Sequence, residues 1–376
     1  MTLFREGNDM ITTTAAIVEE PGAPFTVHEV SVEEPRASEV LVRMVAAGLC
    51  HTDLTVRAGG IPFRLPGILG HEGAGVVEQV GAGVTKVKPG DKVLLSFTSC
   101  GHCGACRDGH PAYCDTWLPS NLINGSRDDG SSTVYRGEDP VGGHFFGQSS
   151  FARHALADER SVVRVDDDAP LEILAPLGCG VQTGFGTVWN ILNPAPGSTL
   201  AVFGAGAVGL AAIMAANELP LKAIFAIDRV PDRLDLATEL GATHTLDVGW
   251  VDTAKTLMEL TGGRGVDYTI DTTGNPGVLR TAVDTLAARG TCAIVGAPPG
   301  GTEVSLDVQG MLTGKKVVGV TLGDGEPETL LPQLVDLHRR GRLPLEKLVR
   351  HYPLEALDQA AHDMHQGQTI KPVVRF

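Results

Sequence analysis

Short runs of alternating hydrophobic and polar residues fill the first half of the chain. Residues 1–180 contain many Val- and Thr-rich runs separated by Gly, Pro and Asp, such as GAGVTKVKPGDKVLL at 81–95. Alternation with a period of two, bounded by turn-forming residues, is typical of short β-strands. We therefore expect residues 1–180 to form a β-rich domain.

Apolar runs alternate with amphipathic segments over residues 181–321. LAVF at 200–203 precedes an Ala-rich segment, and AIFAID at 223–228 precedes the helical pattern RVPDRLDLATELGA. VDYTIDTTG, a helix expected near 276–288, and GTCAIVGAPP continue the alternation. Strands that alternate with crossover helices indicate an α/β fold with a doubly wound parallel sheet.

The rest of the chain, residues 322–376, mixes both patterns. We expect an amphipathic helix over PETLLPQLVDLHRRG, a second helix around 354–366 and a final strand, KPVVRF. Residues 115–145 are polar and rich in Gly, Ser and Asp, which predicts a surface excursion. The apolar run 200–220 has the length of a membrane span, but GAGAVG interrupts it, so a buried strand, turn and helix explain it better.

Composition and charge exclude several classes of function. The 376 residues suffice for two domains that each bury a core. A net charge of −15 argues against nucleic-acid and anionic-membrane partners, which require clustered Lys and Arg. The first 20 residues lack an uninterrupted apolar segment, so we expect no secretion signal. Seven cysteines with metal-type spacing fit a reducing compartment, and we expect a cytoplasmic protein.

Four of these cysteines fall within fifteen residues, in the pattern C-x2-C-x2-C-x7-C. Four thiolates can close a tetrahedral Zn²⁺ shell with Zn–S distances of about 2.3 Å, which leaves no position for substrate. A redox-active thiol cluster is the alternative interpretation. We predict a structural zinc site formed by Cys100, Cys103, Cys106 and Cys114.

A second set, Cys50, His71 and Cys179, offers three metal ligands and leaves the fourth position open. Zinc held in this way is a Lewis acid that lowers the pKa of bound water to about 7, and it would favour loss of the proton of an alcohol in the same way. Thr52 follows the first cysteine, so its hydroxyl is a candidate to take that proton. Asp53 is a candidate to hold the ring of His71 in the required tautomer.

A glycine motif, Gly204, Gly206 and Gly209, follows the strand-like run LAVF and opens a helix. In G-x-G-x-x-G the glycines permit a tight turn, close approach of a pyrophosphate and close helix–strand packing. Asp228 follows 24 residues after Gly204, placed to bind a ribose 2′-OH, which favours NAD over NADP. Arg229 weakens that preference. A glycine turn without ligand and a methyltransferase with the same glycines are the alternatives.

Together these motifs resemble the zinc-dependent alcohol dehydrogenases of the medium-chain dehydrogenase/reductase superfamily. GLCHTDLTVRAG, GHEGAGVVEQVGAGVTKVKPGDKV, the four-cysteine lobe, LGCGVQTGFGTVWN and FGAGAVG occur in the family's order and at its spacing. The resemblance implies a GroES-like catalytic domain over 1–180, a Rossmann NAD-binding domain over 181–321, and completion of the catalytic domain by 322–376. It also implies a homodimer or homotetramer that acts on small alcohols and aldehydes.

The resemblance also assigns roles to single residues. Cys50, His71 and Cys179 correspond to the catalytic zinc ligands, and Glu72 matches an acid that lies behind the metal. One departure is Thr55, which stands where liver-type members have a histidine that ends the proton relay. The proton then leaves through His51, through water or directly to solvent. The cofactor-binding candidates beyond the glycine motif and Asp228 are His51, Thr183, Val208, Arg229, Arg233, Val295, Ala297 and Lys371.

Within the family, GGHFFGQSSFARHAL and APLGCGVQTGFGTV resemble the aryl-alcohol (benzyl alcohol) and geraniol dehydrogenases. That likeness implies a primary alcohol next to an aromatic ring or double bond, with Phe97, Phe145 and Phe146 as candidate substrate-lining residues. The alternative for Phe145 and Phe146 is a role in core packing. The alternatives for the activity are a glutathione-dependent formaldehyde dehydrogenase and a general short-chain alcohol dehydrogenase.

Overall fold

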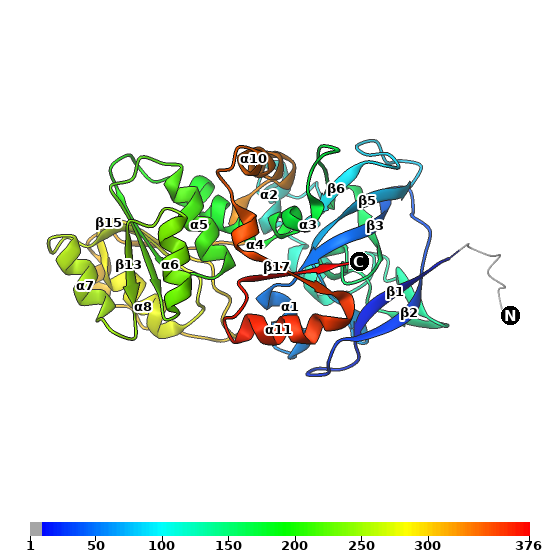
Figure 1. The fold of residues 1–376 in the computed structure, drawn as a ribbon, viewed down its shortest axis with the longest axis horizontal. Helices are drawn as coiled ribbons and strands as arrows, with labels where there is room; N and C mark the ends of the chain where they lie inside the picture. Colours follow the sequence, from blue (N-terminus) through cyan, green and yellow to red (C-terminus); the bar gives the residue numbers. More distant parts are fainter. Residues whose placement is uncertain (1–9) are drawn as a thin grey trace. The chain divides into compact units, whose positions relative to one another are not determined.

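The computed structural model describes residues 10–376, which divide into two compact units (Figure 1). The first unit contains the described residues up to Cys179 together with Glu326–Phe376, and the second contains Gly180–Gly325. The first unit is therefore built from two separate stretches of the chain, whereas the second is continuous in sequence.

The first unit contains two mainly antiparallel sheets. The five-stranded sheet has the order β4-β1-β2-β7-β8, with strands β1 (Ile11–Val18), β2 (Thr26–Val32), β4 (Gly67–Ile68), β7 (Val134–Arg136) and β8 (Asp139–Val141). The seven-stranded sheet has the order β10-β6-β5-β3-β18-β17, and β9 pairs with β3. Its strands are β3 (Glu39–Gly48), β5 (Glu72–Val80), β6 (Lys92–Leu95), β9 (His154–Asp158), β10 (Val162–Arg164), β17 (Val349–Pro353) and β18 (Lys371–Arg375).

Strand β18 brings the end of the chain into this second sheet. It pairs antiparallel with β3, with Val373 opposite Gly48, and parallel with β17. Residues of β3 and β5 are mostly buried and supply a core that includes Val40, Val42 and Val77. The final strand predicted from KPVVRF is present, and one of its two partner strands, β3, comes from the first fifty residues.

Short helices connect the strands of the first unit. They are α1 (His51–Arg57), α2 (Gly104–Arg107), α3 (Leu171–Leu174), α10 (Pro327–Arg339) and α11 (Leu357–His365), with the short turns η1 (Pro111–Tyr113), η2 (Pro119–Ile123), η3 (Phe145–Gly147), η4 (Glu159–Ser161), η5 (Ala175–Gly178), η8 (Leu345–Lys347) and η9 (Leu354–Ala356). Pro327 occupies the first turn of α10, where its missing N–H costs no hydrogen bond. Both helices predicted after residue 322 are present.

The second unit is a six-stranded, entirely parallel sheet of order β13-β12-β11-β14-β15-β16 with helices around it (Figure 1). The strands are β11 (Thr199–Phe203), β12 (Ala223–Asp228), β13 (His244–Asp247), β14 (Val266–Asp271), β15 (Leu286–Ile294) and β16 (Lys316–Gly319). The helices are α4 (Gly180–Gly186), α5 (Ala207–Asn217), α6 (Pro231–Glu239), α7 (Thr253–Leu260), α8 (Pro276–Asp284) and α9 (Val308–Met311), with turns η6 (Thr187–Leu192) and η7 (Leu322–Asp324). This is the strand order of the Rossmann fold.

The apolar run 200–220 consists of a buried strand, a turn and a buried helix, as expected. No helix within residues 10–376 is long and apolar enough to cross a membrane. The helix expected near 276–288 was predicted too long. It ends at Asp284, because Leu286 and Ala287 are already buried as the start of β15.

Residues 115–145 are not simply a surface excursion, and that prediction was wrong. Strand β7 within this stretch pairs with β2, and Arg127 is buried. The Arg127 guanidinium bonds Glu39 Oε1 at 2.5 Å and Glu33 Oε2 at 2.6 Å. The polarity of this stretch therefore serves internal hydrogen bonds as well as the surface.

Candidate active site and metal centres

Three distant segments bring one set of metal-binding groups together in the first unit. Cys50 precedes α1, His71 and Glu72 lie at the start of β5, and Cys179 follows η5. One ligand atom from each of these four side chains lies within 4.8 Å of all the others. His71 and Glu72 are fully buried and Cys179 is 8% exposed, so an ion held here would be largely removed from water.

Asp53 fixes the orientation of the His71 ring. Its Oδ1 lies 3.1 Å from Nδ1 of His71 and accepts from Gly70 N at 2.9 Å, while Oδ2 accepts from Cys50 N at 2.8 Å. A carboxylate at Nδ1 places the ring proton there and leaves a lone pair on Nε2. Nε2 is buried and has no hydrogen-bond partner among the described residues, so this nitrogen suits a metal ion.

The charges around the site also favour a cation. Burial alone would lower the pKa of His71, but Asp53 and Cys50 raise it to about 10. The hydrogen bond from Cys179 and the charge of Lys371 lower the pKa of Cys50, although burial opposes them. A thiolate and an imidazole that attracts positive charge are the donors that Zn²⁺ prefers, so the residues fit zinc.

Glu72 has its own counter-ion within the first unit. Lys371 Nζ on β18 donates to both carboxylate oxygens, at 2.9 and 3.0 Å, and to the Leu49 carbonyl at 3.2 Å. Lys371 is 3% exposed. This contact differs from the pyrophosphate contact that the family resemblance implies for Lys371. Glu72 lies opposite Gly48, where a Cβ would stand 1.9 Å from Oε2, so a glycine is required there.

Helix α1 carries the candidate proton-transfer residues. Thr52 Oγ1 lies 3.8 Å from the sulfur of Cys50. Thr55 Oγ1 instead donates to the His51 carbonyl at 3.0 Å, one turn back on the same helix. His51 is exposed at the first position of the helix. Thr52 therefore lies beside the metal-binding groups, whereas the Thr55 hydroxyl is hydrogen-bonded within its own helix.

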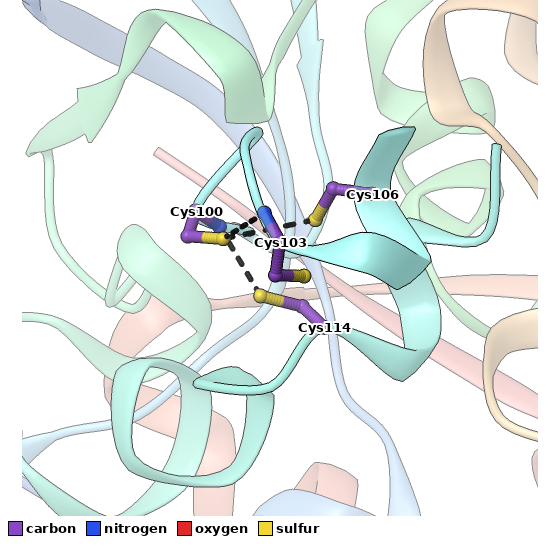
Figure 2. Close-up of side chains that lie close together, drawn as sticks. All are labelled: Cys100, Cys103, Cys106 and Cys114. Carbon is purple, nitrogen blue, oxygen red and sulfur yellow. Dashed lines mark hydrogen bonds between the residues drawn. The ribbon is translucent and has the colours of Figure 1, made fainter. Parts of the chain in front are cut away.

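The four-cysteine lobe forms a second, half-exposed cluster (Figure 2). Its four sulfurs lie within 4.8 Å of one another, and Cys100 and Cys106 are 3.9 Å apart. Backbone N–H groups of His102 and Cys103 point at the Cys100 sulfur from 3.4 and 3.3 Å. No disulfide is present in residues 10–376, and these N–H groups stabilise a thiolate. The four donors fit a closed zinc site.

The glycine motif of the second unit shows why each glycine is needed. At Gly204 (φ +96°) a Cβ would lie 2.4 Å from the hydroxyl of Thr272, and at Gly209 it would lie 1.8 Å from the Gly204 carbonyl. At Gly206, which precedes α5, a Cβ would meet no protein atom within 4 Å. Only the middle glycine is open to the outside, as expected for a turn that a pyrophosphate approaches at a helix N-terminus.

Asp228 ends β12 beside this turn. Its Oδ2 accepts from Ala205 N at 2.6 Å, and its Oδ1 accepts from the backbone N–H of Arg229 at 2.7 Å and of Val230 at 3.0 Å. A carboxylate has about four acceptor positions, so Asp228 retains capacity for a ribose hydroxyl while it holds the glycine turn.

Sequence comparison identifies the family. Residues 36–167 match the alcohol dehydrogenase GroES-like domain, and residues 207–337 match the zinc-binding dehydrogenase domain. The geraniol dehydrogenase of Castellaniella defragrans is 42% identical over 375 residues, which cover 99% of this chain and 100% of that protein. This chain belongs to the zinc-dependent alcohol dehydrogenase family. Zinc and NAD are its cofactors, and its reaction is the oxidation of a primary alcohol.

Two solved alcohol dehydrogenase structures have the same fold throughout. The alcohol dehydrogenase zinc-binding domain protein from Burkholderia ambifaria is 48% identical with a TM-score of 0.95, covering 98% of this chain and 100% of that one. The benzyl alcohol dehydrogenase from Acinetobacter calcoaceticus is 40% identical with a TM-score of 0.94, covering 97% and 99%. The predicted fold class, a GroES-like β-rich domain with a Rossmann domain, is confirmed.

Phe145 and Phe146 of this dehydrogenase pack against His71. Phe146 stacks on the imidazole with ring centroids 4.4 Å apart and planes at 22°, and Phe145 meets it edge-on at 5.4 Å. They are 0% and 4% exposed, and Phe97 after β6 is 3% exposed. Phe145 and Phe146 therefore pack against the His71 ring and support its orientation.

The remaining cofactor candidates of the dehydrogenase lie mainly at the carboxyl ends of the parallel strands. Val208 is in the first turn of α5, and Val295 and Ala297 follow β15. Arg229 is exposed, whereas Nε of Arg233 on α6 is buried without a hydrogen-bond partner in the described part of the chain. Thr183 is buried in α4.

Proposed function

We propose that this alcohol dehydrogenase oxidises a primary alcohol whose carbinol carbon adjoins an aromatic ring or a double bond. The products are the aldehyde and NADH, and the reaction is reversible. The names of its relatives, a geraniol dehydrogenase and a benzyl alcohol dehydrogenase, support this substrate class. The observation that carries the catalytic part is the cluster of Cys50, His71 and Cys179, in which the buried His71 Nε2 has no hydrogen-bond partner among residues 10–376.

In this proposal the first unit is the catalytic domain and holds both zinc ions. Cys50, His71 and Cys179 bind the catalytic zinc, and the four-cysteine lobe binds the structural zinc. When bound, the catalytic zinc supplies a Lewis acid and NAD supplies the hydride acceptor. Asp53 keeps the ring proton of His71 on Nδ1, and Glu72 with Lys371 forms a neutral pair behind the ligands.

The protein's own proton path begins at Thr52. Its Oγ1 lies beside the Cys50 sulfur, where it can accept the proton of the substrate hydroxyl while it passes its own proton onward. Thr55 takes no part, because its hydroxyl is bonded to its own helix. His51, exposed at the start of α1, is the proposed exit to solvent, and it also provides a basic group for the cofactor pyrophosphate.

The second unit is the proposed NAD-binding domain. The N-terminus of its helix α5, at Gly206, is the proposed pyrophosphate site, and Asp228 is the proposed acceptor for a ribose hydroxyl. Thr183, Val208, Val295 and Ala297 are the proposed nicotinamide contacts. Arg229 and Arg233 are further proposed cofactor contacts. Phe97, Phe145 and Phe146 are proposed on the substrate side of the catalytic domain.

We also propose that the enzyme is a cytoplasmic homo-oligomer. Strand β16 is an edge strand of the parallel sheet, and the neighbouring helix α9 exposes Val308 (75%) and Leu312, the residue after it (82%). An edge strand beside exposed apolar side chains is suited to association with a second copy. Sedimentation measurements on the wild type and on Leu312→Glu distinguish a dimer or tetramer from a monomer.

A steady-state substrate panel tests the activity. Benzyl alcohol, geraniol, ethanol and S-hydroxymethylglutathione are compared with NAD and with NADP. Burial of a phenyl or isoprenoid group contributes about 1.5–3 kcal/mol, so kcat/KM for the first two should exceed that for ethanol about ten- to a hundredfold. Preference for S-hydroxymethylglutathione would instead indicate a formaldehyde-oxidising enzyme.

A further inference from the structure

The segment Phe145–Phe151 runs alongside the segment that carries His71. Ser149 Oγ donates to the Ile68 carbonyl at 2.7 Å, Phe151 N to the Leu69 carbonyl at 3.0 Å, and Ser150 N to the Gly70 carbonyl at 2.9 Å. These bonds attach one side of residues 68–70 to the Phe145–Phe151 segment, immediately before the metal-binding histidine.

Gln148 continues these contacts at the histidine itself. Its Nε2 donates to the His71 carbonyl at 3.1 Å and to the Ser96 carbonyl at 2.9 Å, and its Oε1 accepts from Gly73 N at 3.0 Å. Gln148 is fully buried. A Cβ on Gly73 would lie 2.8 Å from Gln148 Oε1, so the glycine makes room for the amide. One amide N–H and the amide oxygen therefore hold the backbone on either side of Glu72, and the second N–H bonds Ser96.

Through Ser96 the same amide is linked to a second metal-binding segment. The Ser96 hydroxyl donates to the Gly178 carbonyl at 2.8 Å, directly before Cys179. Gly178 packs so closely that a Cβ there would lie 2.2 Å from the Leu95 carbonyl. One buried side chain thus contacts the His71 segment directly and the Cys179 segment through one intermediate residue.

The backbone around Gln148 is strained. Phe146 and Ser149 have φ values of 51° and 49°, in the left-handed region that favours glycine. Non-glycine residues remain there only where surrounding contacts determine the conformation, and such positions concentrate at functional sites. Here the strain places the Phe146 ring on the imidazole and the Gln148 amide on the backbone behind it.

We propose that Gln148 is a positioning residue for the catalytic metal, which holds His71 and Cys179 at a fixed separation. This inference rests on the proposed function, because it takes these two residues as zinc ligands. Groups that orient metal ligands typically change metal affinity 10- to 100-fold when they are removed. Gln148→Ala should therefore release the catalytic zinc about 10 to 100 times faster than the wild type.

The experiment uses the full-length, zinc-loaded protein. In Gln148→Ala the four-cysteine zinc should still leave at its wild-type rate, so it serves as the internal reference for the catalytic zinc. Zinc release into an excess of metallochromic chelator is recorded as two kinetic phases, and His71→Ala, which should lack the catalytic phase, assigns them. Cobalt substituted into the catalytic site gives a second readout: Gln148→Ala should change the visible absorption bands, which report ligand geometry.

Asn121 offers a matched control. It is 1% exposed and also makes three amide hydrogen bonds, to Thr98 N, Thr98 O and Trp117 O, each at 2.9 Å. Asn121→Ala should lower the melting temperature as Gln148→Ala does, but it should leave catalytic zinc release and the cobalt spectrum unchanged. If Gln148→Ala folds poorly, Ser96→Ala removes the link to Gly178 alone and should accelerate the same phase by a smaller factor.

The outcomes separate this inference from the proposed function. A Gln148→Ala protein that loses thermal stability but releases both zinc ions at wild-type rates would show that the amide serves folding alone, and would overturn the inference. A wild-type protein with one zinc, retained in full by His71→Ala, would instead overturn the catalytic zinc assignment itself.

Discussion

The two metal-binding clusters of the first unit are built in opposite ways. The four-cysteine lobe takes all its ligands from Cys100–Cys114, lies half-exposed and is supported by its own backbone N–H groups. The Cys50, His71 and Cys179 cluster is largely buried and takes its ligands from three separate segments, with Cys179 more than 100 residues after the other two. A local cluster organises its own loop, whereas the buried cluster depends on the packing of the whole domain.

The largest effect should come from breaking the local cluster. Cys103→Ser should lose one zinc and most soluble protein, because structural zinc contributes folding free energy of about 10–16 kcal/mol in small zinc domains. Cys50→Ser should also lose one zinc but remain folded, because the buried cluster rests on strands that form around it. Metal content and circular dichroism check both, and full metal with full activity in Cys103→Ser would contradict the lobe assignment.

The next effect concerns the proton path at the buried cluster. Thr52→Ala should lower kcat about 10²- to 10⁴-fold, as expected when a positioned proton-transfer group is removed. Thr55→Ala, which loses only a bond to its own helix, should stay within about twofold of the wild type. Steady-state kinetics across pH 6 to 10 compare the two variants. Equal, mild losses would mean that the proton leaves directly to solvent.

Replacing the group that orients His71 should weaken only the buried cluster. Asp53→Asn removes the negative charge that holds the His71 proton on Nδ1. It also replaces one carboxylate oxygen by an NH₂ group, which cannot accept the hydrogen bond from Cys50 N or from Gly70 N. Affinity for the catalytic zinc should fall about 10- to 100-fold while the lobe zinc is unaffected. Competition with a chelator of known affinity measures both ions in one experiment, and equal weakening of the two would refute the distinction.

Substitutions in the second unit should have the smallest effect on the occupancy of either zinc site. Asp228→Gly should weaken NAD binding about ten- to a hundredfold, or about 1.5–3 kcal/mol, and improve NADP relative to NAD. Both zinc ions should stay at wild-type occupancy. Asp232→Ala, a neighbouring acid on α6, is the matched control and should leave the cofactor preference unchanged. A wild-type preference for NADP would contradict the role of Asp228 and direct attention to Arg229.

The difference between the clusters also explains what the sequence could predict. The lobe is visible in its spacing, and the parallel sheet in the alternation of strands and helices. The pairing of Lys371 with Glu72, and the glycine opposite that acid, depend on the register of β18, β3 and β5, which no local pattern encodes. The role of Gln148 could not be predicted either. In the sequence it is only an amide within FFGQSSF, and its hydrogen-bond partners lie 52 to 77 residues away. Residues 115–145 were misjudged because their polar groups bond inward.

The position of β18 has a consequence for synthesis of the chain. The second unit is continuous, so Gly180–Gly325 can fold as soon as it leaves the ribosome. The first unit lacks a central strand until residues 371–375 emerge, and until then Glu72 lacks the ammonium group that balances its charge. A buried carboxylate without a partner is strongly unfavourable, so the catalytic sheet should close late. Strand β18 therefore completes the site whose first ligand, Cys50, was translated more than 300 residues earlier.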